Sequence, residues 1–238
     1  MHWIYLSPHL DDVALSLGGL LWEQTSAGDQ VSVWTICAAD PPPGPFSPFA
    51  DSLHARWNTG RDAVAARREE DIQSCAHLGA AYRHFSIYDC IYRTSLHTGA
   101  YLYPSEHAIF DTLHPDDAPV IEQLALDLSA VLPADARVVC PLSIGGHVDH
   151  QLTLAAAEKL GLSLWYYAEY PYVLYSPIVP PQGANAHRFS IPPPGMVAWG
   201  NAVAAHRSQI STFWGSIPEM QRAITDYSEQ IGGLLLWN

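Results

Sequence analysis

The chain has 238 residues, of which 48% are hydrophobic, so it is long enough to bury one sizeable α/β core, with or without an added lobe. Its net charge of -13, with only 11 Lys and Arg residues, argues against nucleic acid and anionic membrane surfaces as partners, because the field of the protein repels both. The sequence shows no basic leader, no apolar stretch of transmembrane length and no C-x-x-C pair among its four cysteines. We therefore expect one domain over residues 1–238 in a reducing cytoplasm.

The first predicted strand ends in a turn that carries one imidazole and two carboxylates. Residues 3–6 form a short apolar run, and residues 13–24 have apolar side chains at helical spacing. His9, Asp11 and Asp12 lie between them, at the strand end where open α/β sheets bind ligands. Adjacent carboxylates repel each other unless a cation or solvent relieves the repulsion, which favours a binding site. The alternative is that both acids stabilise the start of the helix and that His9 is a surface residue.

The next part of the chain is predicted to complete a parallel βαβ unit and to make long excursions from the sheet edge. In order, we expect a strand at 30–37, a proline-rich loop at 38–58, a helix at 59–78, a strand at 81–87, an irregular aromatic segment at 88–115 and a helix at 116–132. The loop at 38–58 either contributes to function or is a rigid cover. Arg67 and Glu70 share a helix face, so they form a surface ion pair unless the fold buries the arginine.

A second strand-to-helix turn carries His147, Asp149 and His150, between a buried run at 137–141 and a helical pattern at 151–160. If both strands belong to one parallel sheet, both polar turns open on the same edge. His9, Asp12 and His150 can then converge on one metal ion. Two imidazoles and a carboxylate with an open position are typical of catalytic zinc, and the same set suits non-haem iron(II).

The remaining sequence predicts a strand at 162–168, an edge strand at 186–192 and helices at 195–210 and 217–236. Tyr170 follows the first of these strands, so its ring could stack on a sugar at the sheet edge, although an ordinary apolar patch is the alternative. His206 lies within the first of the two helices, where a lone histidine is usually structural.

Four motifs resemble those of the LmbE-like, or PIG-L-type, zinc-dependent N-acetylglucosaminyl deacetylases. They are Pro8-His9-Leu10-Asp11-Asp12 with Gly18-Gly19, Arg67-Arg68-Glu69-Glu70 leading to Leu78-Gly79, His147-Val148-Asp149-His150, and the weaker His206-Arg207-Ser208-Gln209. Leu10 departs from the usual proline of the family, and Val13 stands where many members have glutamate. Gly145 stands where some members have a tyrosine proposed to help the oxyanion.

The resemblance implies a Rossmann-like three-layer α/β sandwich with a mostly parallel sheet and a metal site at the carboxyl edge of its strands. The resemblance implies that His9, Asp12 and His150 bind zinc and that Asp11 accepts a proton. It implies that His147 assists the oxyanion or the leaving group, and that Asp149 holds the imidazole of His147. It also implies substrate binding by Arg67 and His206, to which we add Tyr170. A protonated His147 would be favoured by the Asp149 carboxylate.

We therefore expect a metal-dependent hydrolase that removes the N-acetyl group from an N-acetylglucosamine-type sugar or sugar conjugate, using water as the nucleophile. The expected partner is a small N-acetyl sugar or glycoconjugate. The sequence is also compatible with a homo-oligomer. The alternatives are a non-haem iron oxygenase, which normally uses a β-sandwich, and a non-catalytic sugar-binding module. A nicotinamide enzyme is disfavoured because no G-x-G-x-x-G follows the first strand.

Overall fold

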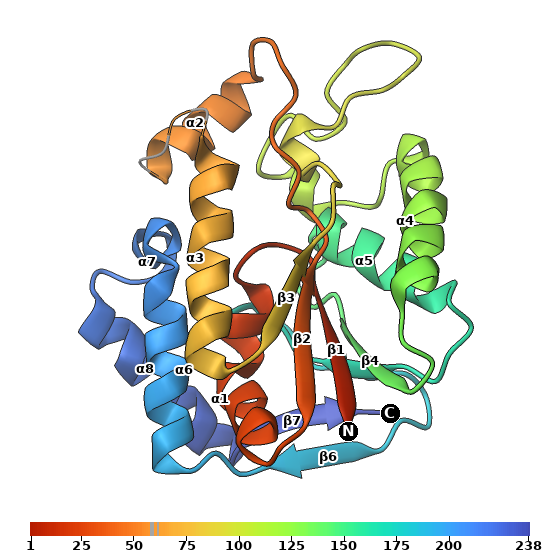
Figure 1. Cartoon of the computed structure of the whole chain (residues 1–238). Helices are drawn as coiled ribbons and strands as arrows, with labels where there is room; N and C mark the ends of the chain where they lie inside the picture. Colours follow the sequence, from red (N-terminus) through yellow and green to blue (C-terminus); the bar gives the residue numbers. More distant parts are fainter. Residues whose placement is uncertain (58–59, 61) are drawn as a thin grey trace.

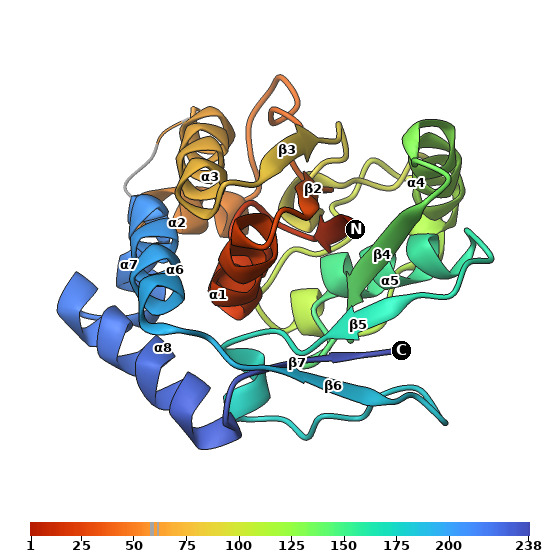
Figure 2. The same cartoon turned by 60° about the horizontal axis from the view of Figure 1, so that its bottom comes forward.

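A computed structural model describes residues 1–57, 60 and 62–238, and it contains one seven-stranded sheet (Figures 1 and 2). The strand order is β3-β2-β1-β4-β5-β7-β6. The strands, in chain order, are β1 (His2–Ser7), β2 (Gln30–Thr35), β3 (Ala81–His84), β4 (Ala136–Pro141), β5 (Trp165–Tyr167), β6 (Ala186–Phe189) and β7 (Leu234–Trp237). Strands β1 to β5 pair in parallel, whereas β7 pairs antiparallel with both β5 and β6. The predicted α/β class with a mostly parallel sheet is confirmed.

Helices cover both faces of the sheet, which gives three layers (Figure 2). On one face lie α1 (Asp12–Ser26), α3 (Ala63–Leu78), α6 (Pro193–Ala205) and α8 (Ile217–Ile231), and on the other lie α4 (Ala118–Val131) and α5 (Val148–Glu158). The shorter helices are α2 (Pro48–Arg56) and α7 (Arg207–Phe213). None of the helices in the described residues combines the length and the apolarity needed to cross a bilayer.

The central strand β1 shows why its sequence is apolar throughout. Trp3 and Tyr5 face the core under α1 and α6, whereas Ile4 and Leu6 face the core under α4 and α5. Each of these side chains is at most 2% exposed. Burying one such side chain typically contributes about 1.5–3 kcal/mol, so a strand covered on both faces needs apolar residues at consecutive positions. This packing holds the carboxyl end of β1 in the middle of the sheet edge.

The predicted loop at 38–58 contains a helix, and this expectation was wrong in part. Helix α2 begins after Ser47, whose side chain accepts a hydrogen bond from the backbone N–H of Ala50 at 3.0 Å. Pro48 occupies the first turn, where its missing N–H is not needed. The serine and the proline together form a helix start, although the proline-rich composition of the segment favours a loop.

The two C-terminal helices also differ from the prediction. The helix expected at 195–210 is divided into α6 and α7 at His206, which has φ -78° and ψ 60°. The helix expected at 217–236 ends at Ile231, and β7 follows. Gly232 and Gly233 have φ 65° and 112°, and a Cβ at Gly233 would lie 2.3 Å from the carbonyl oxygen of Phe189. The glycine pair therefore ends the helix and lets β7 approach β6 closely.

Candidate metal centre and active site

The two polar turns lie side by side because β1 and β4 are parallel neighbours. Helix α1 begins at Asp12 directly after the first turn, and α5 begins at Val148 directly after His147. Asp11 is the residue before α1, yet its side chain makes no capping hydrogen bond and instead lines a cavity. The helix-stabilising alternative therefore does not describe Asp11. The side chain of His9 is only 12% exposed, so this residue does not lie on the surface either.

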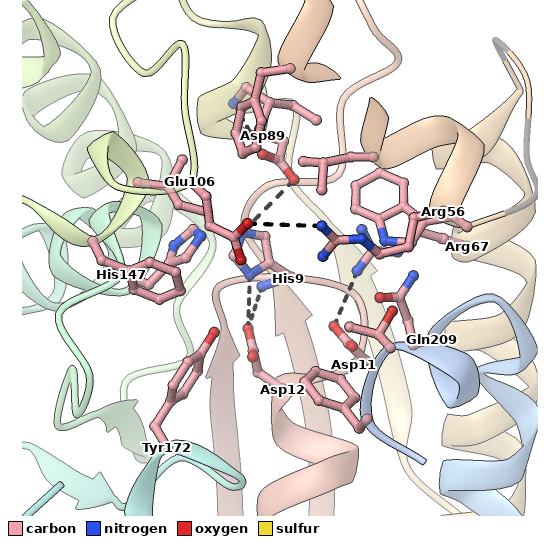
Figure 3. A pocket seen from close by; sticks show the side chains of 18 residues that line it. His9, Asp11, Asp12, Arg56, Arg67, Asp89, Glu106, His147, Tyr172 and Gln209 are labelled. Atoms are coloured by element: carbon pink, nitrogen blue, oxygen red, sulfur yellow. Dashed lines mark hydrogen bonds and ion pairs between the residues drawn. The ribbon is translucent and has the colours of Figure 1, made fainter. Parts of the chain in front are cut away.

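Three donor atoms converge between these turns, and two of them, from His9 and Asp12, are seen in Figure 3. His9 Nδ1 and His150 Nε2 each lie 3.3 Å from the same atom, Asp12 Oδ2. The opposite nitrogen of each ring is held by a carboxylate: His9 Nε2 lies 2.9 Å from Asp149 Oδ2, and His150 Nδ1 lies 3.1 Å from Glu169 Oε1. A carboxylate on the outer nitrogen keeps the proton there and leaves the inner nitrogen as a ligand.

The electrostatics of this cluster suit a cation. Burial disfavours protonation of both rings, but the carboxylates of Asp12 and Asp149 raise the pKa of His9 well above its usual range, and the negative charges of Asp12 and Glu169 raise the pKa of His150 to about 9. The pKa of Asp12 is held well below its usual range, because the two imidazoles outweigh its burial. His150 Nε2 is fully buried and has no hydrogen-bond partner within the described part of the chain. These residues fit a divalent metal, which would replace the protons between them.

Three other groups of donors overlap this cluster. The rings of His9, His147 and His150 could supply three nitrogens, and Asp149 belongs to further groups with Cys90 and His147 or with His9 and Asp89. The guanidinium of Arg93 is bound to the Asp149 carboxylate, so a cation at that carboxylate would meet a positive charge. Asp12 supplies the negative charge that a set of three imidazoles lacks.

His147 is held differently from the expectation. Its Nδ1 accepts a hydrogen bond from the backbone N–H of Asp149 at 3.2 Å, whereas the Asp149 carboxylate binds His9, Arg93 and the backbone N–H of Cys90. The expectation that the Asp149 carboxylate holds a charged His147 is therefore wrong, because this carboxylate binds other groups. Burial, together with the nearby charge of His9, lowers the pKa of His147 well below its usual range. Because Nδ1 is an acceptor, the ring is neutral with its proton on Nε2.

Arg67 is buried and binds Asp11, so it is not part of a surface ion pair with Glu70. Arg67 Nη2 donates to Asp11 Oδ1 at 3.2 Å, and the guanidinium lies 5.0 Å from the centre of the Trp57 ring. The Glu70 carboxylate instead accepts hydrogen bonds from the backbone N–H and the hydroxyl of Ser208, at 2.9 and 2.7 Å. The conformation of Asp11 is thus determined from α3.

A cavity of about 330 Å³ opens above the two turns (Figure 3). Its floor contains His9, Asp11, Asp12 and His147, and its walls are mainly apolar, with Phe49, Leu53, Trp57, Ile91, Ile109, Phe110 and Phe213. Arg56 and Glu106, whose charged atoms are 3.9 Å apart, face each other from α2 and the segment at 88–115. Both segments expected to be excursions from the sheet edge therefore contribute to the cavity.

Two residues expected to bind substrate lie elsewhere. Tyr170 is 3% exposed and packs in the main core against Trp214 and Tyr227, at ring-centre distances of 6.2 and 4.9 Å. Tyr172 occupies the cavity wall in its place and points its hydroxyl inward (Figure 3). His206 is 1% exposed at the junction of α6 and α7 and is not among the residues that line the cavity. Gln209, from the same motif, lines the cavity instead.

Sequence reasoning missed Tyr172, Glu169 and Arg93 as members of the site. The aromatic run at 169–172 pointed to this place but not to the correct ring. Tyr172 packs over Gly145, whose φ is 84° and where a Cβ would lie 2.8 Å from the tyrosine ring. Burial raises the pKa of Tyr172, so its hydroxyl keeps its proton and can donate a hydrogen bond.

Sequence comparisons find a family and a curated relative that resemble this chain. The model of the family described as "PIG-L: GlcNAc-PI de-N-acetylase" matches residues 4–160. The 2'-N-acetylparomamine deacetylase of Niallia circulans is 30% identical over an alignment of 196 positions that covers 71% of this chain and 66% of that protein. The chain thus spans just under two thirds of the length of this curated relative.

Solved structures resemble the chain over its whole length. A zinc-inhibited form of teicoplanin deacetylase superimposes with a TM-score of 0.86 at 28% identity, covering 100% of this chain and 97% of the other. The A40926 pseudoaglycone deacetylase gives a TM-score of 0.76 at 27% identity, with coverages of 99% and 96%. From its motifs, its fold and these matches, the chain belongs to the PIG-L family of GlcNAc-PI de-N-acetylases.

Proposed function

We propose that the chain is a zinc-dependent hydrolase that removes an N-acetyl group from an amino sugar or a sugar conjugate. The observation that carries the proposal is the pair of imidazoles whose outer nitrogens are held by carboxylates and whose inner nitrogens lie 3.3 Å from one oxygen of Asp12. The family membership and the deacetylase names of the relatives support the reaction class. His9, Asp12 and His150 are the proposed ligands.

Asp11 is the proposed general base. A zinc ion bound at this site would lower the pKa of a water molecule and polarise the acetyl carbonyl. Asp11 lies next to a ligand without being one, and its Oδ1 is fixed by Arg67 at 3.2 Å. It accepts one proton from the attacking water, and the same proton can pass to the nitrogen of the leaving amine. Arg67 thus supports catalysis through the base it holds.

His147 is the proposed oxyanion donor. In its neutral form with the proton on Nε2, it can donate a hydrogen bond to the carbonyl oxygen as negative charge develops there, as neutral histidines do in other enzymes. Asp149 contributes in two ways, because its backbone N–H holds His147 at 3.2 Å and its carboxylate holds His9 at 2.9 Å. The hydroxyl of Tyr172, on the cavity wall, is a second donor.

The substrate is proposed to be a small N-acetyl sugar or glycoconjugate, handled by one domain over residues 1–238. The cavity places polar groups at its floor and aromatic rings on its walls, which suits a sugar that carries an apolar substituent. The cytoplasm is the proposed compartment, since all four cysteines are buried free thiols.

Release of a primary amine from a panel of N-acetylglucosamine conjugates tests the proposed function. We expect activity with the zinc-loaded protein, loss of activity after chelator treatment, and recovery when zinc is returned. Metal analysis and oxygen consumption on the same samples examine the iron oxygenase alternative. Full activity of a metal-free sample, or binding of every conjugate without release of amine or acetate, would refute the proposal.

Zinc uptake should release protons and become tighter as the pH rises. A metal must displace the proton of His150, whose pKa is raised from 6.5 to about 9 by Asp12 and Glu169 against the effect of burial. Apparent zinc affinity should therefore rise between pH 6.5 and about 9 and level off above that range. Calorimetry in buffers of different ionisation enthalpy measures this release. An affinity that is flat across the range would contradict the ligand assignment.

The stability of the metal-free protein should change in the opposite direction. The folded-state pKa of His150 lies above that of an unfolded histidine, so the ion pairs of this residue stabilise the fold fully below pH 6.5. This contribution disappears as the pH rises through about 9. Thermal unfolding of the metal-free protein across the same range measures it.

A further inference from the structure

We propose that Arg93 is a positioning residue of the metal centre, which fixes the Asp149 carboxylate that in turn orients the imidazole of His9. The inference rests on the proposed function, since it concerns the ligands of the metal proposed there. Arg93 lies between β3 and α4, outside the four motifs, and only 5% of it is exposed. The evidence for its role is the set of contacts that its guanidinium makes.

The guanidinium of Arg93 connects two buried carboxylates. Its Nη1 donates to Asp149 Oδ1 and to the carbonyl oxygen of Tyr88, the latter at 3.1 Å. On the other side, Nη2 donates to Asp117 Oδ2 at 3.1 Å, and Nε lies 2.9 Å from Asp117 Oδ1. The hydroxyl of Tyr103 donates to Asp117 Oδ2 at 2.6 Å, and its ring lies 5.3 Å from the guanidinium. The chain Tyr103–Asp117–Arg93–Asp149–His9 is therefore continuous.

The two oxygens of Asp149 have separate tasks. Oδ1 binds Arg93, while Oδ2 accepts from the backbone N–H of Cys90 at 3.0 Å and lies 2.9 Å from His9 Nε2. A rotation of this carboxylate would break both sets of contacts at once. Asp149 and Asp117 are both 0% exposed, and a buried carboxylate stays ionised only with a partner of opposite charge. Arg93 supplies that partner to both.

Fixing Asp149 determines which nitrogen of His9 faces the metal. With Nε2–H directed at Asp149, Nδ1 faces Asp12 Oδ2 at 3.3 Å and can offer its lone pair to a metal that replaces the proton between them. Outer partners of this kind typically change metal affinity by about 10–100-fold when they are removed. The segment between β3 and α4 thus has a second role besides lining the cavity, because it also holds a ligand of the metal in position.

Arg93→Lys tests the inference, because lysine keeps the charge but cannot bind two carboxylates with one planar fork. We expect the zinc dissociation constant, measured by competition with a chromophoric chelator, to increase by about 10–100-fold. The visible spectrum of the cobalt(II)-substituted protein should also change, which a purely structural role would not cause. Arg83→Lys is the matched control: Arg83 is exposed, lies 5.4 Å from the Trp34 ring, and should leave both readouts unchanged.

A double-mutant cycle tests whether Arg93 acts through Asp149. Asp149→Asn should weaken zinc binding, and adding Arg93→Lys to it should weaken binding no further, since the two residues then belong to one chain of contacts. Additive losses would overturn the inference. If Arg93→Lys does not fold, Tyr103→Phe decides: it keeps every charge, removes one hydrogen bond to Asp117, and should weaken zinc binding in the same direction.

The result separates this inference from the proposed function. Wild-type protein that binds no zinc refutes the proposed function itself. Wild-type protein that binds zinc, together with folded Arg93→Lys and Tyr103→Phe proteins that bind it equally well, refutes only the role of Arg93.

Discussion

Asp11→Asn should keep its zinc and lose about two to four orders of magnitude in turnover, the range that a general base typically contributes. Asparagine has the shape of aspartate, and its side-chain oxygen can still accept the hydrogen bond that Arg67 makes at 3.2 Å. It cannot accept the proton of the attacking water. Amine release measures the turnover, and elemental analysis of the same sample measures the metal.

Asp127→Asn is the matched control for this prediction. Asp127 is an exposed residue of α4 that accepts a hydrogen bond from Gln123 at 2.8 Å, which an asparagine oxygen can also accept. Both turnover and metal content should be unchanged in this protein. Turnover near that of the wild type in Asp11→Asn would mean that another group accepts the proton.

Asp12→Asn should lose the metal. Asp12 Oδ2 is the atom that both inner histidine nitrogens approach within 3.3 Å, and the substitution removes the only negative charge of the proposed ligand set. The loss of affinity should exceed the roughly 10–100-fold that outer partners cause. Excess zinc should then restore part of the activity of Asp12→Asn and none of that of Asp11→Asn, because only the former fails through its metal content.

His147→Ala provides the decisive contrast to Asp12→Asn. If His147 is an oxyanion donor, its removal should leave the zinc in place and reduce turnover by about 100–1,000-fold. If instead His147→Ala loses the metal while Asp12→Asn retains it, the ligands are the three imidazoles of His9, His147 and His150, and Asp12 has another role. Metal content measured on the two purified proteins distinguishes these arrangements.

The two polar turns could be predicted because each depends on local sequence. A strand, a short polar turn and a helix are each encoded within a few residues, and parallel pairing brings both turns to one edge. That much predicts that His9, Asp12 and His150 converge. The direction of a side chain is determined by contacts distant in the sequence, and for this reason the Asp149 carboxylate was assigned to His147 rather than to His9 and Arg93.

The aromatic run after β5 illustrates the same limit. Tyr170 and Tyr172 are equally apolar and lie two residues apart, so the sequence does not say which one faces the cavity. Tyr170 packs in the core against Trp214 and Tyr227, whereas Tyr172 packs beside Gly145. The contact between Glu169 and His150 could not be predicted either, because His150 lies in another strand-to-helix turn, distant in the sequence.

The placement of β7 between β5 and β6 has a consequence for the order of folding. Strand β6 precedes β7 in the chain, yet β7 is the strand that joins it to the rest of the sheet. During synthesis β6 therefore remains unpaired until α6, α7, α8 and then β7 have been made. Strands β1 to β5, which carry the two polar turns, can assemble earlier. A ribosome-bound chain stalled before β7 would thus present the edge of β5 to the cell, together with the aggregation hazard of an open strand.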